Sequence, residues 1–276
     1  MSRRKKKSSA PAVVIAMLLV AVAVVALVPT GSAVKSEPSD TCNVDFTDLE
    51  KISIPGALTN EMLHYEGFTV AFNAEAHQPN YVVWTLTPEH TDGPYTRNSS
   101  DVNFAPDARV NGCATLADYK RSGFDRGHMA PAADNKWSLE AMKDCHYLTN
   151  MCPQDNKLNA GAWATVEKNT RKWVERHGTL VIVAGPVLSD RLTRTIGQSE
   201  IPVPERFFKV ILAPEANPPM GIGFIMPNSY VEGGAQSTVV SIDQVEAVTG
   251  FDFFAALPDS IENIVESQNS IRIWNK

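Results

Sequence analysis

The pattern of apolar and polar residues along the chain predicts a mixture of strands and helices. Short runs rich in β-branched and aromatic residues indicate strands at residues 70–73, 81–86, 147–151, 179–184, 207–212 and 223–226. Residues 77–80 are expected to form the hairpin turn between the first two strands, and Gly185-Pro186 to end the fourth. Helices are predicted over residues 162–176, from three- and four-residue apolar spacing, and over residues 242–248, between a Ser241 cap and Gly250. Because the elements intermix without a regular βαβ alternation, we expect an α+β fold with a mostly antiparallel central sheet flanked by helices.

The first 33 residues have a pattern of their own. Five basic residues at positions 3–7 precede an unbroken apolar run over residues 12–28, and Gly31 and Ala33 follow as small residues. This order is typical of a secretory signal peptide cleaved after Ala33. The run of 17 residues is also close to the length of a spanning helix, so an uncleaved membrane anchor is the alternative. Both alternatives predict a body outside the cytoplasm, whether secreted, periplasmic or membrane-anchored.

The remainder of the chain reads as one acidic unit. We expect residues 34–50 to be a polar linker and residues 51–276 a single domain, because no repeat or second change in composition follows. The whole chain has 25 Lys and Arg against 31 Asp and Glu, and without the five N-terminal basic residues the balance is 20 against 31, or −11. This balance excludes a protein that coats nucleic acid through a broad basic surface.

Four cysteines lie beyond residue 33, at positions 42, 113, 145 and 152. An even number in an exported chain predicts two disulfides, and the absence of a CxxC pair argues against a zinc site. A strand over residues 147–151 would hold the Cα atoms of Cys145 and Cys152 about 23 Å apart. We therefore do not expect these two cysteines to pair with each other.

Candidate chemistry is concentrated between residues 121 and 134. His128 and Arg126 lie in a segment with Gly123 and Gly127, so a general base and a cation for an anionic substrate are placed together. The alternative is a salt-bridged turn with a structural histidine.

A second group follows downstream. Asn159 offers a neutral oxygen ligand of the kind that suits Mg²⁺, and its alternative role is a helix cap. Glu167 and Arg171 stand four residues apart on the predicted helix, in the order that favours an ion pair. That pair is either part of a site or a solvated surface bridge.

Together these motifs resemble the DNA/RNA non-specific endonuclease family, which includes endonuclease G and secreted sugar-non-specific nucleases. The match begins with Asp125-Arg126-Gly127-His128 and extends from about residue 54 to the C-terminus. It continues through the 150–154 segment, the Asn159–Trp163–Glu167–Arg171 spacing, Gly185-Pro186, the 203–210 segment and the 249–254 segment. Cys152 departs from the small residue expected at its position, and the acidic body is unfavourable for substrate steering.

The resemblance implies a ββα-metal fold and a set of residue roles. His128 corresponds to the general base, Asn159 to the direct metal ligand, and Glu167 to the residue that holds a water molecule on the metal. Arg126, Arg171 and Arg97 correspond to phosphate-facing cations, and Asn150 to a polar residue that lines the site. The implied cofactor is Mg²⁺, with Mn²⁺ as the alternative ion, and the implied partners are DNA and RNA, bound through phosphate. A homodimer and membrane anchoring through residues 12–28 stay open.

The predicted function is therefore Mg²⁺-dependent hydrolysis of DNA and RNA phosphodiester bonds with little sequence preference. Two alternatives are a metal-dependent phosphodiesterase acting on small nucleotides and an inactive nucleic-acid-binding envelope protein. The second is disfavoured because Arg126, His128, Asn159 and Glu167 are all present.

Overall fold

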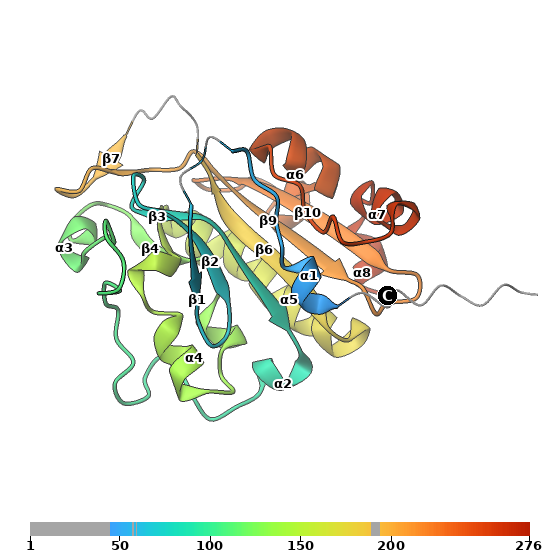
Figure 1. Cartoon of the computed structure of the whole chain (residues 1–276), viewed down its shortest axis with the longest axis horizontal. Coiled ribbons are helices and arrows are strands. Elements are labelled where there is room, and N and C mark those ends of the chain that lie inside the picture. The colour runs from blue at the N-terminus through green and yellow to red at the C-terminus, as the bar shows by residue number, and fades with distance from the viewer. Residues whose placement is uncertain (1–44, 57, 59, 189–193) are drawn as a thin grey trace, which may run out of the picture. The chain divides into compact units, whose positions relative to one another are not determined.

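A seven-stranded antiparallel sheet forms the centre of the computed structural model, which describes residues 45–56, 58, 60–188 and 194–276 (Figure 1). The strand order is β1-β2-β3-β6-β9-β10-β11. The strands are β1 Glu61–His64, β2 Thr69–Asn73, β3 Gln78–Leu86, β6 Leu180–Val187, β9 Arg206–Ala213, β10 Met220–Pro227 and β11 Val239–Val240. The predicted α+β class with a large antiparallel sheet is confirmed.

Both faces of this sheet are buried, which explains the nearly continuous apolar runs of its central strands. In β6, Ile182 packs into one hydrophobic core and the next residue, Val183, packs into the other. The same alternation in β3 places Trp84 in the first core and Val83 in the second. Side chains alternate between the two faces of a strand, so a strand covered on both faces needs apolar residues at every position.

Helices cover the two faces. Helix α5 (Ala164–His177) contributes Trp173 to the first core, and α6 (Ile242–Thr249) and α7 (Asp259–Glu266) pack on the second. Ser241 accepts a hydrogen bond from Gln244 N, and Gly250 adopts a left-handed φ of 72°, so both predicted end signals of α6 are confirmed and the helix is one residue longer than predicted. The other helices are α1 Phe46–Leu49, α2 Pro88–Thr91, α3 Leu116–Tyr119, α4 Leu139–Asp144 and α8 Ile271–Trp274, with single turns η1 Ala132–Asp134, η2 Leu148–Asn150 and η4 Ala235–Thr238.

A separate antiparallel pair, β4 (Asp125–His128) and β5 (Met151–Gln154), lies beside the segment that leads into α5. That segment is a π-helix, η3 (Leu158–Trp163), with a non-helical kink at Gly161. Two strands and a helix thus form the ββα unit implied by the resemblance. A third small pair joins β7 (Thr195–Ile196) and β8 (Ile201–Pro202).

Most predicted elements differ from the structure by one to three residues at an end, and the helix predicted from residue 162 begins as α5 at Ala164. Three differences have a clear cause. The hairpin turn lies before residue 78, because Gln78 and Pro79 of β3 already pair with Asn73 and Phe72 of β2. Strand β6 does not end at Gly185 but continues to Val187, since Pro186 pairs with Phe207 while its missing amide is tolerated. The predicted strand at 147–151 is instead the turn η2 followed by β5, because the chain must reverse there to pair with β4.

The N-terminal predictions lie mostly outside the described residues. This holds for the signal peptide or anchor and for residues 34–44 of the predicted linker. The last part of that linker contains α1, whose Leu49 is fully buried. Within the described residues, no helix combines the length and apolar character needed to cross a bilayer.

Candidate active site

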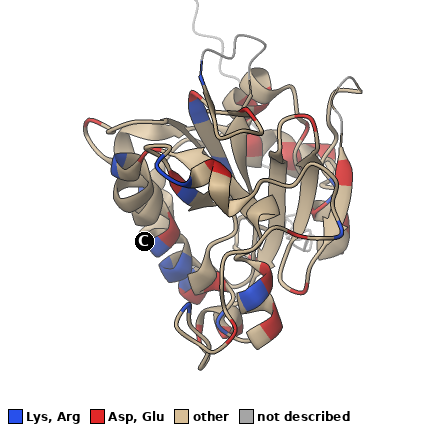
Figure 2. Cartoon of the chain, turned by 90° about the vertical axis from the view of Figure 1, so that its left-hand side faces the viewer, with Lys and Arg blue, Asp and Glu red and all other residues tan. Residues whose placement is uncertain are grey.

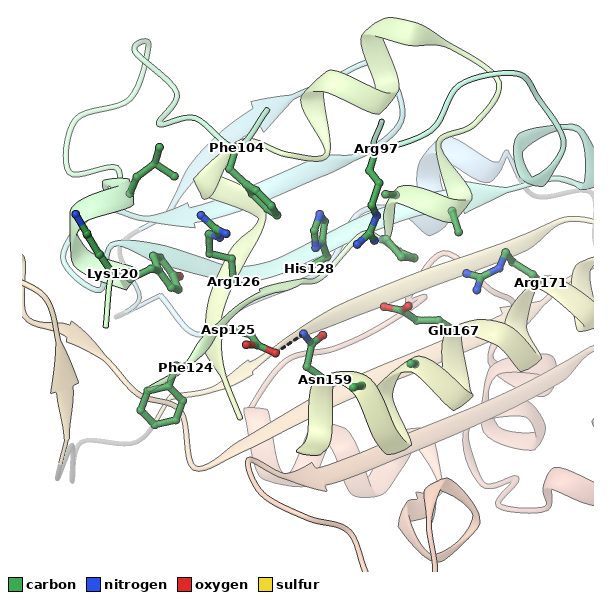
Figure 3. Close-up of a pocket in the computed structure, with 17 residues that line it drawn as sticks. Arg97, Phe104, Lys120, Phe124, Asp125, Arg126, His128, Asn159, Glu167 and Arg171 are labelled. Carbon is green, nitrogen blue, oxygen red and sulfur yellow. Dashed lines mark hydrogen bonds between the residues drawn. The ribbon is translucent and has the colours of Figure 1, made fainter. Parts of the chain in front are cut away.

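A cavity of about 850 Å³ opens where β4, η3 and the start of α5 meet the 88–112 segment (Figure 3). It brings together six of the seven site residues predicted from the sequence: Arg97, Arg126, His128, Asn159, Glu167 and Arg171. The side chains of Phe104, Lys120 and Asp125 complete its polar and aromatic wall. The seventh residue, Asn150, does not line it.

Strand β4 positions His128 on this wall. The strand is held to β5 in a register that pairs His128 with Met151, and Trp163 Nε1 donates a 3.2 Å hydrogen bond to the His128 carbonyl. Gly127 permits this close pairing, because a Cβ atom there would lie 2.5 Å from the Cβ atom of Gln154. The motif therefore needs glycine next to its histidine for packing.

The imidazole of His128 is neutral at physiological pH. Burial lowers its pKa to about 3, and the positive charges of Arg97 and Arg126 act in the same direction. Nε2 is buried without a hydrogen-bond partner, and His128 lines the cavity, so we infer that Nδ1 is the ring nitrogen open to it. A neutral ring with one open nitrogen can accept a proton.

Asn159 stands half-buried at the second position of η3. Its Nδ2 donates a 2.9 Å hydrogen bond to Asp125 Oδ2, so the amide nitrogen is held at β4 (Figure 3). The side-chain oxygen of Asn159 takes no part in that bond and can act as a ligand. This contact is not a helix cap, because the partner of Asn159 is a side chain on another element.

Glu167 lies on the first turn of α5 and faces the same cavity. Burial raises the pKa of its carboxyl group to about 7, against the opposing effect of the Lys209 ammonium group. Lys209 is itself buried on β9, with Nζ 4.2 Å from the Trp163 ring centroid. A partly buried acid that feels the charge of a buried cation is unusual, and shifted pKa values of this kind occur often at functional sites.

Two arginines supply positive charge to the wall without an acidic partner among the described residues. Arg97 is exposed on the 88–112 segment, and Arg126 extends from β4 with its guanidinium 4.1 Å from the Phe104 ring centroid. Stacking on an aromatic face holds a guanidinium in place while its N–H groups stay free. Both arginines are therefore available to an anionic ligand.

Arg171 differs from its predicted arrangement. Its Nη1 forms a 2.9 Å ion pair with Oδ1 of Asp134, which is buried, and not the predicted pair with Glu167. Burial raises the pKa of Asp134 by destabilising its ionised form, and the ion pair with Arg171 opposes this effect. Arg171 reaches the edge of the cavity, but much of its charge is balanced by Asp134.

The prediction that Asn150 lines the site is corrected by the structure. Its side chain is fully buried and donates 2.9 Å hydrogen bonds to the carbonyls of Ala130 and Cys145, while its Oδ1 accepts one from Ala130 N. An amide that uses both ends in this way has little left for a ligand. Asn150 instead fixes the position of the backbone at Ala130, two residues beyond His128, relative to Cys145.

The sequence analysis missed Asp125 and Phe104, which line the cavity, and Lys209, whose charge acts on Glu167. Asp125 stood in the quoted motif without a role, and Phe104 lay in a loop without periodicity. Lys209 had the clearest signal, because it is the one charged residue between Phe207 and Leu212, a run predicted to be a buried strand. A lysine inside such a run must find a special environment.

The charge distribution agrees with the acidic balance of the chain. On the face drawn in Figure 2, basic residues are interspersed with acidic ones and do not gather into one broad patch. Besides the cavity, basic side chains line an adjoining pocket, where Lys136, Lys168, Arg171 and Lys172 occur with Glu175.

Comparisons with known proteins agree with this geometry. A family model described as DNA/RNA non-specific endonuclease matches residues 46–260. The chain is 30% identical over 218 residues to "Endonuclease G, mitochondrial" of Bos taurus, covering 75% of this chain and 72% of the relative. It is 33% identical over 256 residues to "Mitochondrial nuclease" of Saccharomyces cerevisiae, covering 84% and 77%. A solved structure of an EndoG/EndoGI complex aligns with a TM-score of 0.67 at 25% identity, covering 72% of this chain and 87% of the other.

The predicted location outside the cytoplasm is wrong. Both of these relatives are named as mitochondrial proteins, not as secreted or periplasmic ones. The prediction depended on residues 1–33, where basic residues occur without acidic ones. Secretory signals and mitochondrial transit peptides share that charge pattern, so it does not separate them.

The prediction of two disulfides is wrong as well. Cys113, Cys145 and Cys152 are free thiols, and Cys42 lies outside the described residues. Two disulfides would need at least one bond among the three described cysteines. As expected, Cys145 and Cys152 do not pair with each other.

Proposed function

The chain belongs to the DNA/RNA non-specific endonuclease family, and we propose that it cleaves DNA and RNA internally with Mg²⁺ as its cofactor and His128 as its general base. The family makes the protein a phosphodiester hydrolase. One observation carries the finer proposal: the open nitrogen of a neutral His128 shares one cavity with Asn159, Glu167 and two arginines without acidic partners.

The donor set fits a hard divalent cation. Asn159 would hold the ion through its amide oxygen, positioned by the bond to Asp125, and the Glu167 carboxylate in the same cavity would hold a water molecule on the ion. Mg²⁺ keeps several of its water molecules when it binds a protein, so it needs only a few oxygen ligands from the chain. When bound there, the ion supplies Lewis-acid stabilisation of the charge that develops on the phosphate. A nearby dication also favours the ionised form of Glu167.

His128 performs the proton transfer. Its Nδ1 takes a proton from the water that attacks phosphorus, the P–O bond to one sugar oxygen breaks, and that oxygen takes a proton from solvent. Hydrogen bonds from Asn150 and Trp163 to the His128–Ala130 backbone keep the ring in place. Arg97 and Arg126 contribute to the low pKa of His128. A bound phosphate neutralises part of their charge, so substrate binding raises the pKa of His128 towards the range in which a general base is effective.

Substrate recognition rests on phosphate. Arg97 and Arg126 bind the non-bridging oxygens, with Arg126 braced on Phe104. Contacts to phosphate and sugar position a nucleic acid without reading its bases, which accounts for cleavage of both DNA and RNA with little sequence preference.

The test uses the purified full-length protein with supercoiled plasmid and with RNA, in Mg²⁺ or in EDTA. We expect both substrates to be cut only with the ion, and His128→Ala to lose about 10²- to 10⁴-fold of the rate while its circular dichroism is unchanged. His64→Ala, at an exposed histidine on β1, is the matched control. Wild-type turnover by His128→Ala would overturn the assignment of the base. Cleavage of dinucleotides but not of circles would favour the small-nucleotide phosphodiesterase.

A further inference from the structure

His128 also belongs to a cluster of three side chains, and the proposed function does not use the other two, Cys145 and His146. One nitrogen of His128, one nitrogen of His146 and the sulfur of Cys145 all lie within 4.8 Å of one another. The rings of His128 and His146 meet edge to face, with centroids 5.1 Å apart. Cys145 and His146 follow α4 directly and are 0% and 3% exposed.

We propose that His128, Cys145 and His146 bind Zn²⁺ or a similarly thiophilic divalent ion, and that this ion inhibits the nuclease. The inhibition rests on the proposed role of His128 as the base, whereas the binding does not. One sulfur and two imidazole nitrogens are the ligands that zinc prefers, and they differ from the oxygen ligands of Asn159 and Glu167 that suit Mg²⁺.

The spacing of the cluster fits such an ion. Ligands at about 2.0–2.3 Å from a tetrahedral zinc lie roughly 3.3–3.6 Å apart. Cys145 Sγ and His146 Nδ1 are already 3.3 Å apart, and the Met142 carbonyl oxygen lies 3.1 Å from the former and 2.8 Å from the latter. Small movements of side chains would bring His128 to the same ion.

A second observation points to a ligand at this place. Without an ion, Cys145 and His146 both bond to the Met142 carbonyl, but Nε2 of His128 is buried with no partner. Buried polar atoms rarely stay unpaired, and His128 Nε2 is on the side of the ring away from its open Nδ1. An ion in the cluster gives this nitrogen a partner.

The local charge permits a cation. Burial raises the pKa of the Cys145 thiol, with Asp144 and Asp134 acting in the same direction and Arg97 opposing them. The thiol proton must therefore leave for solvent when the ion binds, as it does at zinc thiolate sites generally. The negative charges of Asp134 and Asp144 offset the positive charge of Arg97.

Inhibition follows from the chemistry of the imidazole ring. A neutral imidazole has one N–H group and one lone pair. An ion bound to Nε2 uses the lone pair there, so the ring hydrogen is placed on Nδ1, the nitrogen that faces the cavity. That nitrogen can then no longer accept a proton from water, although the substrate cavity stays open.

The binding test uses Co²⁺ as a probe for zinc in the full-length reduced protein. We expect a thiolate-to-cobalt absorption band in the wild type that is lost in Cys145→Ser, whose hydroxyl can still bond to Met142. Cys152→Ser is the matched control, since Cys152 is an equally buried thiol outside the cluster. His146→Gln is the second variant, and it should also lose tetrahedral binding. A band of equal strength in Cys145→Ser and wild type would overturn the site.

The inhibition test titrates Zn²⁺ against plasmid cleavage at fixed Mg²⁺. The inhibition constant should rise at least about tenfold in Cys145→Ser, as for other losses at metal sites, and stay unchanged in Cys152→Ser. Equal inhibition of all three proteins would place the ion at Asn159 and Glu167 and overturn the proposal. A cobalt band without zinc inhibition would retain the site and overturn the role of His128 as the base.

Discussion

Asn159 Nδ2 donates a 2.9 Å hydrogen bond to Asp125 Oδ2, which connects η3 to β4, the first strand of the ββα unit. The same carboxylate oxygen accepts a 2.8 Å bond from Asn156. Two nearby asparagines thus share one partner, but only Asn159 lines the cavity. A comparison of Asn156 with Asn159 can therefore distinguish the loss of a bond to Asp125 from the loss of the proposed metal ligand.

Replacing each asparagine by alanine tests this difference. Asn159→Ala should raise the Mg²⁺ concentration for half-maximal cleavage at least about tenfold, because it removes a ligand oxygen. Asn156→Ala loses a bond to the same carboxylate and should leave that concentration nearly unchanged. Cleavage rates measured over a Mg²⁺ titration check both variants. Similar shifts in the two would show that Asn159 acts only by holding Asp125.

Arg171→Ala should destabilise the fold. The buried carboxylate of Asp134 would lose its ion-pair partner and retain a 3.3 Å bond from Trp84 Nε1. Leaving a buried charge unpaired costs about 2 kcal/mol when the lost partner is partly exposed. Urea denaturation measures the loss, with the exposed Lys172→Ala as control. Adding Asp134→Asn should restore part of the stability, and purely additive losses would argue against the coupling.

Glu266→Gln should stabilise the protein in alkaline solution. Burial, with repulsion from Glu246 and Glu262, raises the pKa of Glu266 to about 8 in the folded state from an ordinary 4.5. Between these values the folded state holds more protons than the unfolded one, so this contribution to stability is complete below pH 4.5 and is lost as the pH rises through 8.

Glu266→Gln has no carboxyl group to ionise, so it does not lose this stability as the pH rises. Its advantage over the wild type should be near zero at pH 4.5 and reach about 2 kcal/mol at pH 9, since each unit of pKa difference corresponds to about 1.4 kcal/mol before solvation reduces it. Thermal unfolding across this range provides the measurement. Glu175→Gln, at an exposed position on α5, serves as control. A pH-independent difference would mean that Glu266 is ionised in the fold.

Binding of duplex DNA should depend only weakly on salt. Each phosphate neutralised adds about −0.9 to the slope of log affinity against log salt, so two to four contacts give about −2 to −4. Arg126→Ala should make the slope shallower by about one unit at fixed Mg²⁺, in an inactive His128→Ala background. Arg171→Ala should change it less, because Asp134 already balances that charge. A wild-type slope near −8 would reveal an extended basic surface.

The strands and the main helices could be predicted from the sequence because their causes are local. Because β6 is buried on both faces, it needs apolar residues at every position. Ser241 and Gly250 end α6 through bonds to residues three or four positions away along the chain. The motif around His128 could be recognised from four consecutive residues, although the packing of Gly127 against Gln154 is a tertiary contact. Where the causes were non-local, as in the turn after Tyr147, the predicted strand was misplaced.

The sequence by itself determined the family, the antiparallel sheet and the residue types gathered in the cavity. Only the tertiary structure decided which side chains are partners. Arg171 has an acid four residues away in sequence, yet it pairs with Asp134, 37 residues away, because the fold places that buried carboxylate 2.9 Å from its guanidinium. Asn150 bonds to the backbone of Ala130 and does not line the cavity. Cys145 and His146 each place a ligand atom within 4.8 Å of a nitrogen of His128. These arrangements depend on burial and distance, which the order of residues along the chain does not specify.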